Sequence, residues 1–343
     1  MTHVAILLEK LMYIFSMTTE AGARRVRLTS TGGPEVLRVE PMPVPRPGPG
    51  QILITAEAAG VAFHDITTRQ GLTPGALPEV QGFDVVGHVA QVGAGVTEFR
   101  AGQRVGALIG HGGYATHVLA PAKRAAPLPE GHPAEELDAL VLNYLTAWQM
   151  FHRVARPSSG QAVLVLGAAG GVGSALSQLA HAAGVRVYGT SSPGRRDRVE
   201  ASGATWVPDA AAVPEPVAAT FDPVGGPSLA RSRRATKPSG VVVSYGFSFA
   251  TGAGYSRIGA LTRTAGALLR AKLTPGARVV LHAVERTVDK DPAGFRADLA
   301  ALVEHLSTGA IKPEVVTLPL DQAAEAHRRL ENREVEGKLV LIP

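Results

Sequence analysis

Cysteine is absent from the 343 residues of this sequence. Without thiols the chain can form neither a disulfide nor a thiolate metal site, and it has no cysteine nucleophile. Any oxidation or reduction that it carries out therefore depends on a bound cofactor.

The sequence also lacks a long hydrophobic run. No stretch of about 20 consecutive apolar residues is present to span a bilayer. Residues 1–16 are apolar but interrupted by Glu9 and Lys10, and they carry neither a basic leader nor a small-residue cleavage site. We interpret residues 1–24 as an N-terminal extension, and we expect a cytoplasmic protein without membrane contact.

Charged residues make up only 18% of the chain and aromatic residues 5%, whereas 45% is hydrophobic, a composition typical of a globular protein. The net charge of +5 comes from scattered Lys and Arg, and no nucleic-acid-binding signature accompanies it. We therefore expect no nucleic-acid partner. At about 150 residues per domain, the length predicts about two domains.

The segment 161–180, QAVLVLGAAGGVGSALSQLA, has the pattern of a strand, a tight turn and a helix. The apolar run 163–166 predicts a parallel strand buried on both faces. A glycine cluster follows, and then apolar residues recur at helical spacing. Glycines in such a turn allow positive φ and close approach of a pyrophosphate, whose charge the free N–H groups of the helix bind. This context predicts a dinucleotide site.

The remaining pattern predicts an α/β protein with two kinds of domain. Between residues 25 and 118, short β-like runs are separated by Pro and Gly, as in a β-rich barrel. After residue 139, strands alternate with helices, as in a doubly wound parallel sheet. We place the final strand 337–343 back on the β-rich domain. The predicted limits are 25–138 with 283–343 for the β-rich domain and 139–282 for the cofactor domain.

Five motifs in order resemble the medium-chain dehydrogenase/reductase superfamily: residues 82–105 (GFDVVGHVAQVGAGVTEFRAGQRV), LTAW at 145–148, the glycine turn, FDPVGG at 221–226 and GKLVLIP at 337–343. Within it, the chain is most similar to the zinc-free quinone oxidoreductases and the vesicle amine transport protein-like members. The resemblance implies a GroES-like catalytic domain and a Rossmann domain, with the active site in the cleft between them.

The resemblance also bears on zinc. Zinc alcohol dehydrogenases of this superfamily have cysteine where Ala62 stands and histidine where Phe83 stands, and they add a four-cysteine lobe that is missing here. We therefore expect no metal. The remaining candidate ligands are His64, Asp65, Asp84 and His88. We expect His88 to lie within a strand and to pack or bond locally, and Asp84 to bond the backbone of the turn before it.

The residues after the second Rossmann strand favour NADPH. NAD enzymes place a carboxylate about 20 residues after the first glycine, but no carboxylate lies between Ala182 and Arg196. Hydroxyls and guanidiniums stand there instead, and they suit a 2′-phosphate. By resemblance, Ser191 and Arg196 are the expected contacts. The alternative is that Arg195, Arg196 and Arg198 form a solvated helix start.

Further cofactor contacts are implied by the resemblance. Thr146 of LTAW is expected near the cofactor phosphates, although it also suits a cap or packing role. Ala169, Gly170, Gly171 and Val172 correspond to the pyrophosphate turn. Gly246 and Phe247 correspond to the place where the backbone approaches the nicotinamide, although Gly246 also suits a plain chain turn.

The segment 60–74 corresponds to the catalytic segment of the family. Relatives often have asparagine where Ala62 stands and tyrosines where Thr67 and Thr73 stand. His64, Asp65 and Arg69 are the catalytic candidates. Because histidine changes charge near neutral pH, His64 is the predicted proton donor, with a surface or backbone-bonded histidine as the alternative. Asp65 is expected to orient this segment by pairing with Arg69.

Two segments bear on assembly. The strand 277–284 is predicted at the edge of the Rossmann sheet, where pairing with a second copy gives a homodimer. The preceding helix 255–272 is amphipathic and basic. It suits the mouth of the active site, the dimer interface or an anionic membrane, and we expect its apolar face to pack against protein.

These features predict an NADPH-dependent, zinc-independent reductase of activated C=C bonds in a quinone, enone or enoyl substrate. A trans-acting enoyl reductase of a biosynthetic pathway is an alternative within the enzymes. A second alternative is an NADPH-binding interaction protein with little turnover, similar to the vesicle amine transport proteins. Oxidation of NADPH against a panel of acceptors separates the enzymes from the interaction protein.

Overall fold

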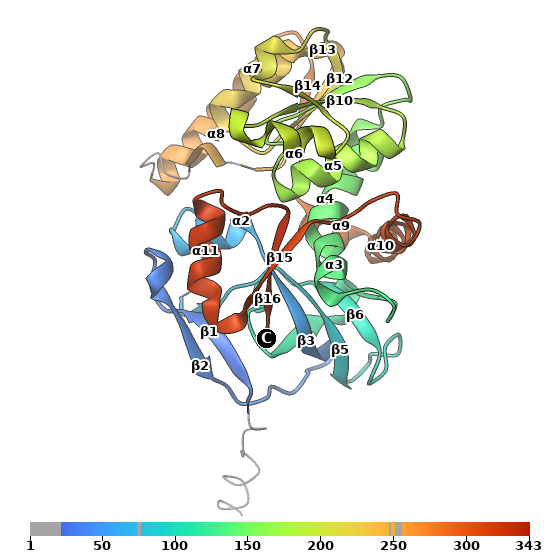
Figure 1. Ribbon diagram of the computed structural model, residues 1–343. Helices are drawn as coiled ribbons and strands as arrows, with labels where there is room; N and C mark the ends of the chain where they lie inside the picture. Colours follow the sequence, from blue (N-terminus) through green and yellow to red (C-terminus); the bar gives the residue numbers. More distant parts are fainter. Residues whose placement is uncertain (1–21, 74–76, 247, 251–255) are drawn as a thin grey trace, which may run out of the picture.

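The computed structural model describes residues 22–343 except 74–76, 247 and 251–255. It has an α/β fold built on two large sheets, one above the other in Figure 1, with a long helical segment running between them. None of the helices in the described ranges is long and apolar enough to cross a membrane.

The upper sheet has six parallel strands in the order β11-β10-β9-β12-β13-β14. This is the doubly wound Rossmann order, in which a ligand binds beyond the carboxyl ends of the central strands. Its strands are β9 (Ala162–Val165), β10 (Arg186–Thr190), β11 (Thr205–Val207), β12 (Val217–Asp222), β13 (Thr236–Ser244) and β14 (Arg278–Leu281). Its helices include α5 (Gly171–Ala182), α6 (Arg196–Ala201), α7 (Leu229–Ala235) and α8 (Arg257–Leu273).

The lower sheet has seven strands, in the order β15-β16-β3-β5-β6-β8 with β7 paired to β3. They are β3 (Gln51–Val61), β5 (Asp84–Val92), β6 (Arg104–Leu108), β7 (His117–Pro121), β8 (Ala125–Pro127), β15 (Val315–Pro319) and β16 (Lys338–Ile342). A small sheet lies beside it and contains β1 (Arg24–Leu28), β2 (Leu37–Pro41) and β4 (Glu79–Val80). Because β16 pairs with β3, the end of the chain joins the β-rich sheet as predicted.

Further helices join and flank the sheets: α2 (Phe63–Arg69), α3 (Ala134–Ala139), α4 (Leu145–Trp148), α9 (Val284–Lys290), α10 (Pro292–Ser307) and α11 (Ala323–Glu331). The strand predicted at 277–284 is shorter, because β14 ends at Leu281 and α9 begins at Val284. The fold class predicted from the sequence, a GroES-like β-rich part with a Rossmann sheet, is confirmed.

The GFD motif contributes to a fully buried ionic cluster beneath the cleft end of the lower sheet. Asp84 Oδ2 lies 2.6 Å from Lys338 Nζ, and Asp138 Oδ2 lies 3.8 Å from the same ammonium. All three side chains are at most 2% exposed. A Cβ at Gly60 would lie 2.3 Å from Lys338 Nζ, so the cluster requires glycine there. The expectation that Asp84 bonds the backbone of the preceding turn is therefore wrong, because Lys338 is its side-chain partner.

Candidate active-site cleft

A cleft of about 1800 Å³ lies between the Rossmann sheet and the β-rich sheet. Its walls come from the carboxyl ends of the Rossmann strands, from α2 and from the segment after α11. Most of the residues singled out in the sequence line it: His64, Thr146, Ala169, Gly170, Gly171, Val172, Ser191 and Gly246.

Three positions of the glycine turn require glycine. Gly167 has φ +67°, and a Cβ at Gly173 would lie 2.3 Å from the Gly167 carbonyl oxygen. A Cβ at Gly171 would lie 2.2 Å from Asn143 Nδ2. The turn leads directly into α5, whose first N–H groups have no partner within the helix and suit a phosphate. This local geometry fits the pyrophosphate of a dinucleotide.

The structure separates the two adjacent arginines after β10. Arg195 lines the cleft together with Ser191 and is half-buried. Arg196 does not line it, because its Nε donates to Glu200 Oε1 at 2.9 Å and its guanidinium lies 5.7 Å from the centre of the Trp206 ring. Of these two neighbours, Arg195 rather than the predicted Arg196 therefore lines the cleft.

Arg198 is not part of a solvated helix start. Its side chain is 8% exposed, and its Nε donates to the carbonyl of Ala169 at 2.9 Å. The same guanidinium forms ion pairs with Glu314 and with Glu336, the latter at 3.0 Å. Arg198 thus ties the glycine turn to the segment that leads into β16, a role that charge spacing alone did not indicate.

The opposite end of the Rossmann wall contains Gly246, Tyr245 and His282. A Cβ at Gly246 would lie 2.4 Å from the Pro223 carbonyl oxygen, so the backbone there needs glycine. Phe247 lies outside the described residues. His282, which the sequence did not single out, lines the cleft, and burial lowers its pKa to about 4, so it is neutral at pH 7.

On the β-rich side, α2 presents its first turn to the cleft. His64 is exposed, lines the cleft and contacts Phe83 edge to face with ring centres 5.2 Å apart. Asp65 and Arg69, the other two catalytic candidates, are at most 2% exposed and do not line the cleft. Both side chains make their polar contacts with other protein groups rather than facing the cleft.

The predicted ion pair between Asp65 and Arg69 is wrong. The Asp65 carboxylate accepts from the backbone N–H of Ala62 at 2.8 Å and from the Tyr114 hydroxyl at 3.0 Å. Arg69 instead forms an ion pair with Glu331 at 2.6 Å. The two side chains point from α2 toward different partners. Residues four apart in a helix are close enough to form an ion pair, but here each has a partner in another segment.

The threonines that replace family tyrosines are also turned away from the cleft. The Thr68 and Thr73 hydroxyls are 2.6 Å apart, and Thr67 donates to the His64 carbonyl at 2.8 Å. All three are buried. They hold the α2 segment together and offer no hydroxyl to a substrate.

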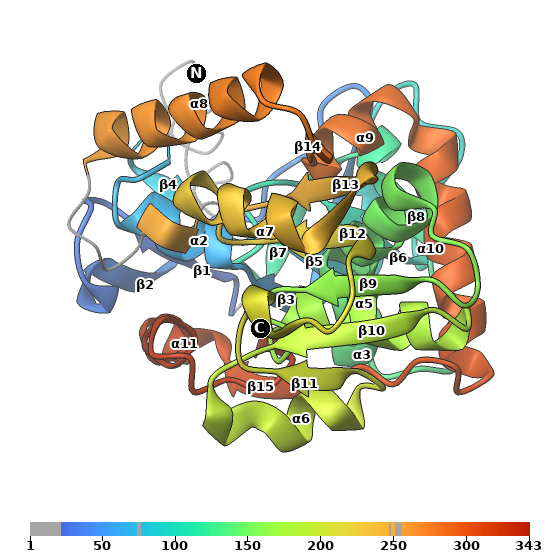
Figure 2. The same ribbon diagram turned by 90° about the horizontal axis from the view of Figure 1, so that it is seen from above.

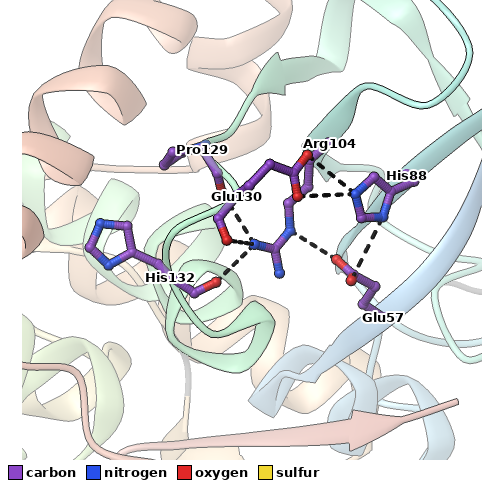
Figure 3. Close-up of polar contacts among 6 residues, drawn as sticks. All are labelled: Glu57, His88, Arg104, Pro129, Glu130 and His132. Carbon is purple, nitrogen blue, oxygen red and sulfur yellow. Dashed lines mark hydrogen bonds and ion pairs between the residues drawn. The ribbon is translucent and has the colours of Figure 1, made fainter.

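His88 lies within a strand, β5, as expected, but its side chain pairs with carboxylates of two other segments rather than bonding locally. Its Nε2 lies 3.2 Å from a Glu130 carboxylate oxygen, and its Nδ1 lies 3.7 Å from Glu57, which also accepts from the buried Arg104 (Figure 3). In the parts of the chain that the structure describes, no three His, Cys, Asp or Glu side chains are grouped so that they could hold a metal ion.

A Rossmann sheet joined to a GroES-like sheet, with a cleft lined by residues of both, defines the class of medium-chain dehydrogenases and reductases. Residues 48–130 match the alcohol dehydrogenase GroES-like domain, and residues 197–341 match the zinc-binding dehydrogenase family. The human synaptic vesicle membrane protein VAT-1 homolog is 30% identical over 92% of this chain and 85% of its own length.

Two quinone oxidoreductases are also similar. That of Pseudomonas aeruginosa is 30% identical, with 94% of this chain and 100% of the relative covered. The crystal structure of the Escherichia coli enzyme complexed with NADPH has a TM-score of 0.81 at 26% identity, covering 94% of this chain and 100% of that chain. The chain belongs to the medium-chain dehydrogenase/reductase superfamily, in its quinone oxidoreductase and VAT-1-like branch, which confirms the resemblance seen in the sequence.

Proposed function

We propose that this protein is an NADPH-dependent, zinc-independent oxidoreductase that reduces activated C=C bonds in quinone, enone or enoyl substrates. The observation that carries the proposal is the cleft itself, which has the tight glycine turn on one wall and the first turn of α2, with His64, on the other. Ala62 and Phe83 stand where the superfamily's zinc enzymes have metal ligands. Residues 139–282 form the cofactor domain of this proposal, and residues 25–138 with 283–343 form the catalytic domain.

The residues present fit NADPH. The glycine turn from Ala169 to Val172 and the start of α5 hold the pyrophosphate, with Thr146 beside them on α4. Ser191 and Arg195 take the 2′-phosphate, and Gly246 admits the nicotinamide close to the backbone. When bound, the cofactor supplies the hydride.

The chain itself provides orientation and a proton. The apolar side chains of Phe83 and Val61 line the β-rich side of the cleft. His64 lies at the cleft surface, where its imidazole can deliver a proton to the carbon or oxygen that becomes basic after reduction. Since no strong nucleophile is required, this small set of groups suffices for the reaction.

NADPH oxidation measured against a panel of enones, quinones and enoyl thioesters tests the function. We expect turnover with at least one class and with NADPH preferred over NADH. The second candidate, an NADPH-binding interaction protein, is favoured by the burial of the Thr67 and Thr73 hydroxyls away from the cleft. Tight NADPH binding without oxidation on any acceptor would select that candidate.

His64→Gln tests the proton donor. We expect kcat to fall about tenfold, less than the ~10²-fold typical of a general acid, because His64 is exposed and water can take its place. The KM for NADPH should not change. His181→Gln is the control, since that histidine is also exposed but does not line the cleft. Equal kcat for His64→Gln and wild type would remove His64 from the mechanism.

We also propose a homodimer formed through β14 and the outer face of α8. The helix packs Ala260, Ala267 and Leu268 on the Rossmann body and turns its other large apolar residues outward, so the packing of that face against protein stays a prediction. Ile258, Leu261, Leu269 and Leu273 are 58–74% exposed. Helix α8 lies beside the edge strand β14 (Figure 2). An open edge beside an apolar face suits pairing across a two-fold axis.

Leu269→Glu tests this interface, because a buried unpaired carboxylate at an apolar contact is costly. Sedimentation velocity should show a dimer for the wild type and a monomer for Leu269→Glu. Val39→Glu, which places the same charge at an exposed residue of β2, should remain dimeric. A monomeric wild type at tens of micromolar would reject the proposal.

A further inference from the structure

A chain of four buried polar side chains connects α2 to α11 behind the cleft. Arg69 Nε donates to His327 Nδ1 at 3.2 Å, His327 Nε2 lies 3.1 Å from the Tyr114 hydroxyl, and that hydroxyl lies 3.0 Å from Asp65 Oδ2. All four side chains are at most 2% exposed. The proposed reaction uses none of them directly.

The direction of every hydrogen bond in this chain is fixed by its first member. A guanidinium can only donate, so His327 Nδ1 must be the unprotonated, accepting nitrogen. The proton of neutral His327 is then on Nε2 and is donated to the oxygen of Tyr114. Tyr114 in turn donates its own proton to Asp65, whose ionised form is the stronger acceptor. Burial lowers the pKa of His327 to about 3, in agreement with a neutral ring.

Both ends of the chain reach the cleft. Asp65 Oδ2 also accepts from the N–H of Ala62, which closes the first turn of α2, and Oδ1 accepts from the N–H of Gly82 at 3.2 Å. Ala62 and His64 line the cleft beside this turn. At the other end, Arg69 forms an ion pair with Glu331, which lines the cleft at the end of α11.

The Tyr114 ring is packed tightly between Gly82 and His327. A Cβ at Gly82 would lie 2.6 Å from both the ring and the backbone nitrogen of Tyr114, and Gly82 has φ +101°. The ring also contacts His327 edge to face at 5.8 Å. The hydroxyl is thereby held between Asp65 and His327, where a phenylalanine would fit without it.

We propose that Tyr114 and His327 are positioning residues of the cleft, and that the directed chain from Arg69 to Asp65 holds the first turn of α2, and with it His64, at a fixed place relative to α11. The inference deepens the proposed reductase function, on which its kinetic readout rests. Breaking the chain at one hydroxyl should loosen the turn without removing any group that faces the cleft.

The chain also makes the cleft sensitive to pH. Burial raises the pKa of Asp65 to about 6, although the N–H of Ala62, His64, the N–H of Gly82 and Tyr114 favour its ionised form. The support of the α2 turn is present while Asp65 is ionised and is lost as pH falls through about 6. The charged and titratable groups around the chain are His64, Arg69, Asp84, Tyr114, Asp138, His327, Glu331 and Lys338.

Tyr114→Phe tests the proposal, with Tyr144→Phe as the matched control. Tyr144 is also buried, and its hydroxyl makes one hydrogen bond, to Gln178, away from Asp65. For Tyr114→Phe we expect kcat to fall about three- to tenfold with the KM for NADPH unchanged. Because Asp65 loses a donor, its titration, followed by carbon-13 NMR of aspartate-labelled protein, should move upward from about pH 6. Tyr144→Phe should change neither quantity.

The NMR readouts keep this test separate from the test of the enzymatic function. Nitrogen-15 NMR of the wild type should show His327 protonated at Nε2 and not at Nδ1, whether or not the protein turns over a substrate. Protonation at Nδ1, or an Asp65 titration that is the same in Tyr114→Phe and wild type, overturns the proposal. If no acceptor oxidises NADPH but the NMR results are as expected, the reductase function fails and the positioning chain stands.

Discussion

Lys338→Met should lower the free energy of unfolding by about 3–5 kcal/mol at pH 8, the usual cost of removing one partner from a buried ion pair. The ammonium is the positive centre between Asp84 and Asp138, and all three side chains are at most 2% exposed. Methionine has nearly the same length, so packing is retained while two carboxyl groups lose their cation. Urea unfolding at pH 8 measures the effect.

The loss should be smaller at pH 4.5 than at pH 8. Burial and the charge of Asp84 raise the pKa of Asp138 well above its usual range, and burial also raises that of Asp84. Without Lys338, Asp84 and Asp138 have higher pKa values in the folded protein than in the unfolded chain. The free energy of unfolding therefore declines as pH rises above the pKa values of the unfolded chain. A loss that grows toward low pH would contradict this account.

Two variants control this experiment. Lys290→Met removes an exposed lysine at the end of α9 and should change stability by less than about 0.5 kcal/mol. Asp84→Leu combined with Lys338→Met removes the cation and its nearest carboxylate together. This double variant should be more stable than Lys338→Met alone, because an apolar pair replaces an uncompensated buried charge.

The sequence predicted those parts of the fold whose cause is local. The apolar run before Gly167 and the helical spacing after Gly173 both act over a few residues, and they gave β9 and α5 correctly. The final strand was placed correctly because its motif came in a fixed order with the others. The end of β14 was misplaced because apolar residues resume at Ala283 and Val284 after the single polar residue His282, so the pattern does not mark where the strand ends.

The sequence could not predict side-chain pairing between distant segments. Asp84 and Lys338 are 254 positions apart, and Arg69 and His327 are 258 apart. Asp65 and Arg69, which are near in sequence, leave α2 toward different partners. The sequence also could not say what covers the apolar face of α8, because an amphipathic pattern shows that a helix has such a face but does not say which molecule covers it.

The sequence also could not distinguish between the adjacent arginines Arg195 and Arg196 after β10. Motif comparison indicated a basic group at this turn, but the choice between neighbours depends on where the 3₁₀ turn ends and α6 begins. Because α6 starts at Arg196, that side chain points along the helix to Glu200, and Arg195 is left at the cleft. This difference leads to a prediction with a large effect on cofactor choice.

Arg195→Ala should raise the Kd for NADPH about thirtyfold and leave the Kd for NADH unchanged, since charge-assisted hydrogen bonds to a phosphate are each worth about 1.5–3 kcal/mol. Arg196→Ala is the matched control and should change the NADPH Kd less than threefold, because that guanidinium is already paired with Glu200 at 2.9 Å. Titration of intrinsic fluorescence with each nucleotide gives both constants. A large loss of NADPH affinity in Arg196→Ala and none in Arg195→Ala would show that Arg196, the residue expected from the sequence, binds the 2′-phosphate. Equal losses for NADPH and NADH in Arg195→Ala would show that Arg195 binds a part common to both nucleotides.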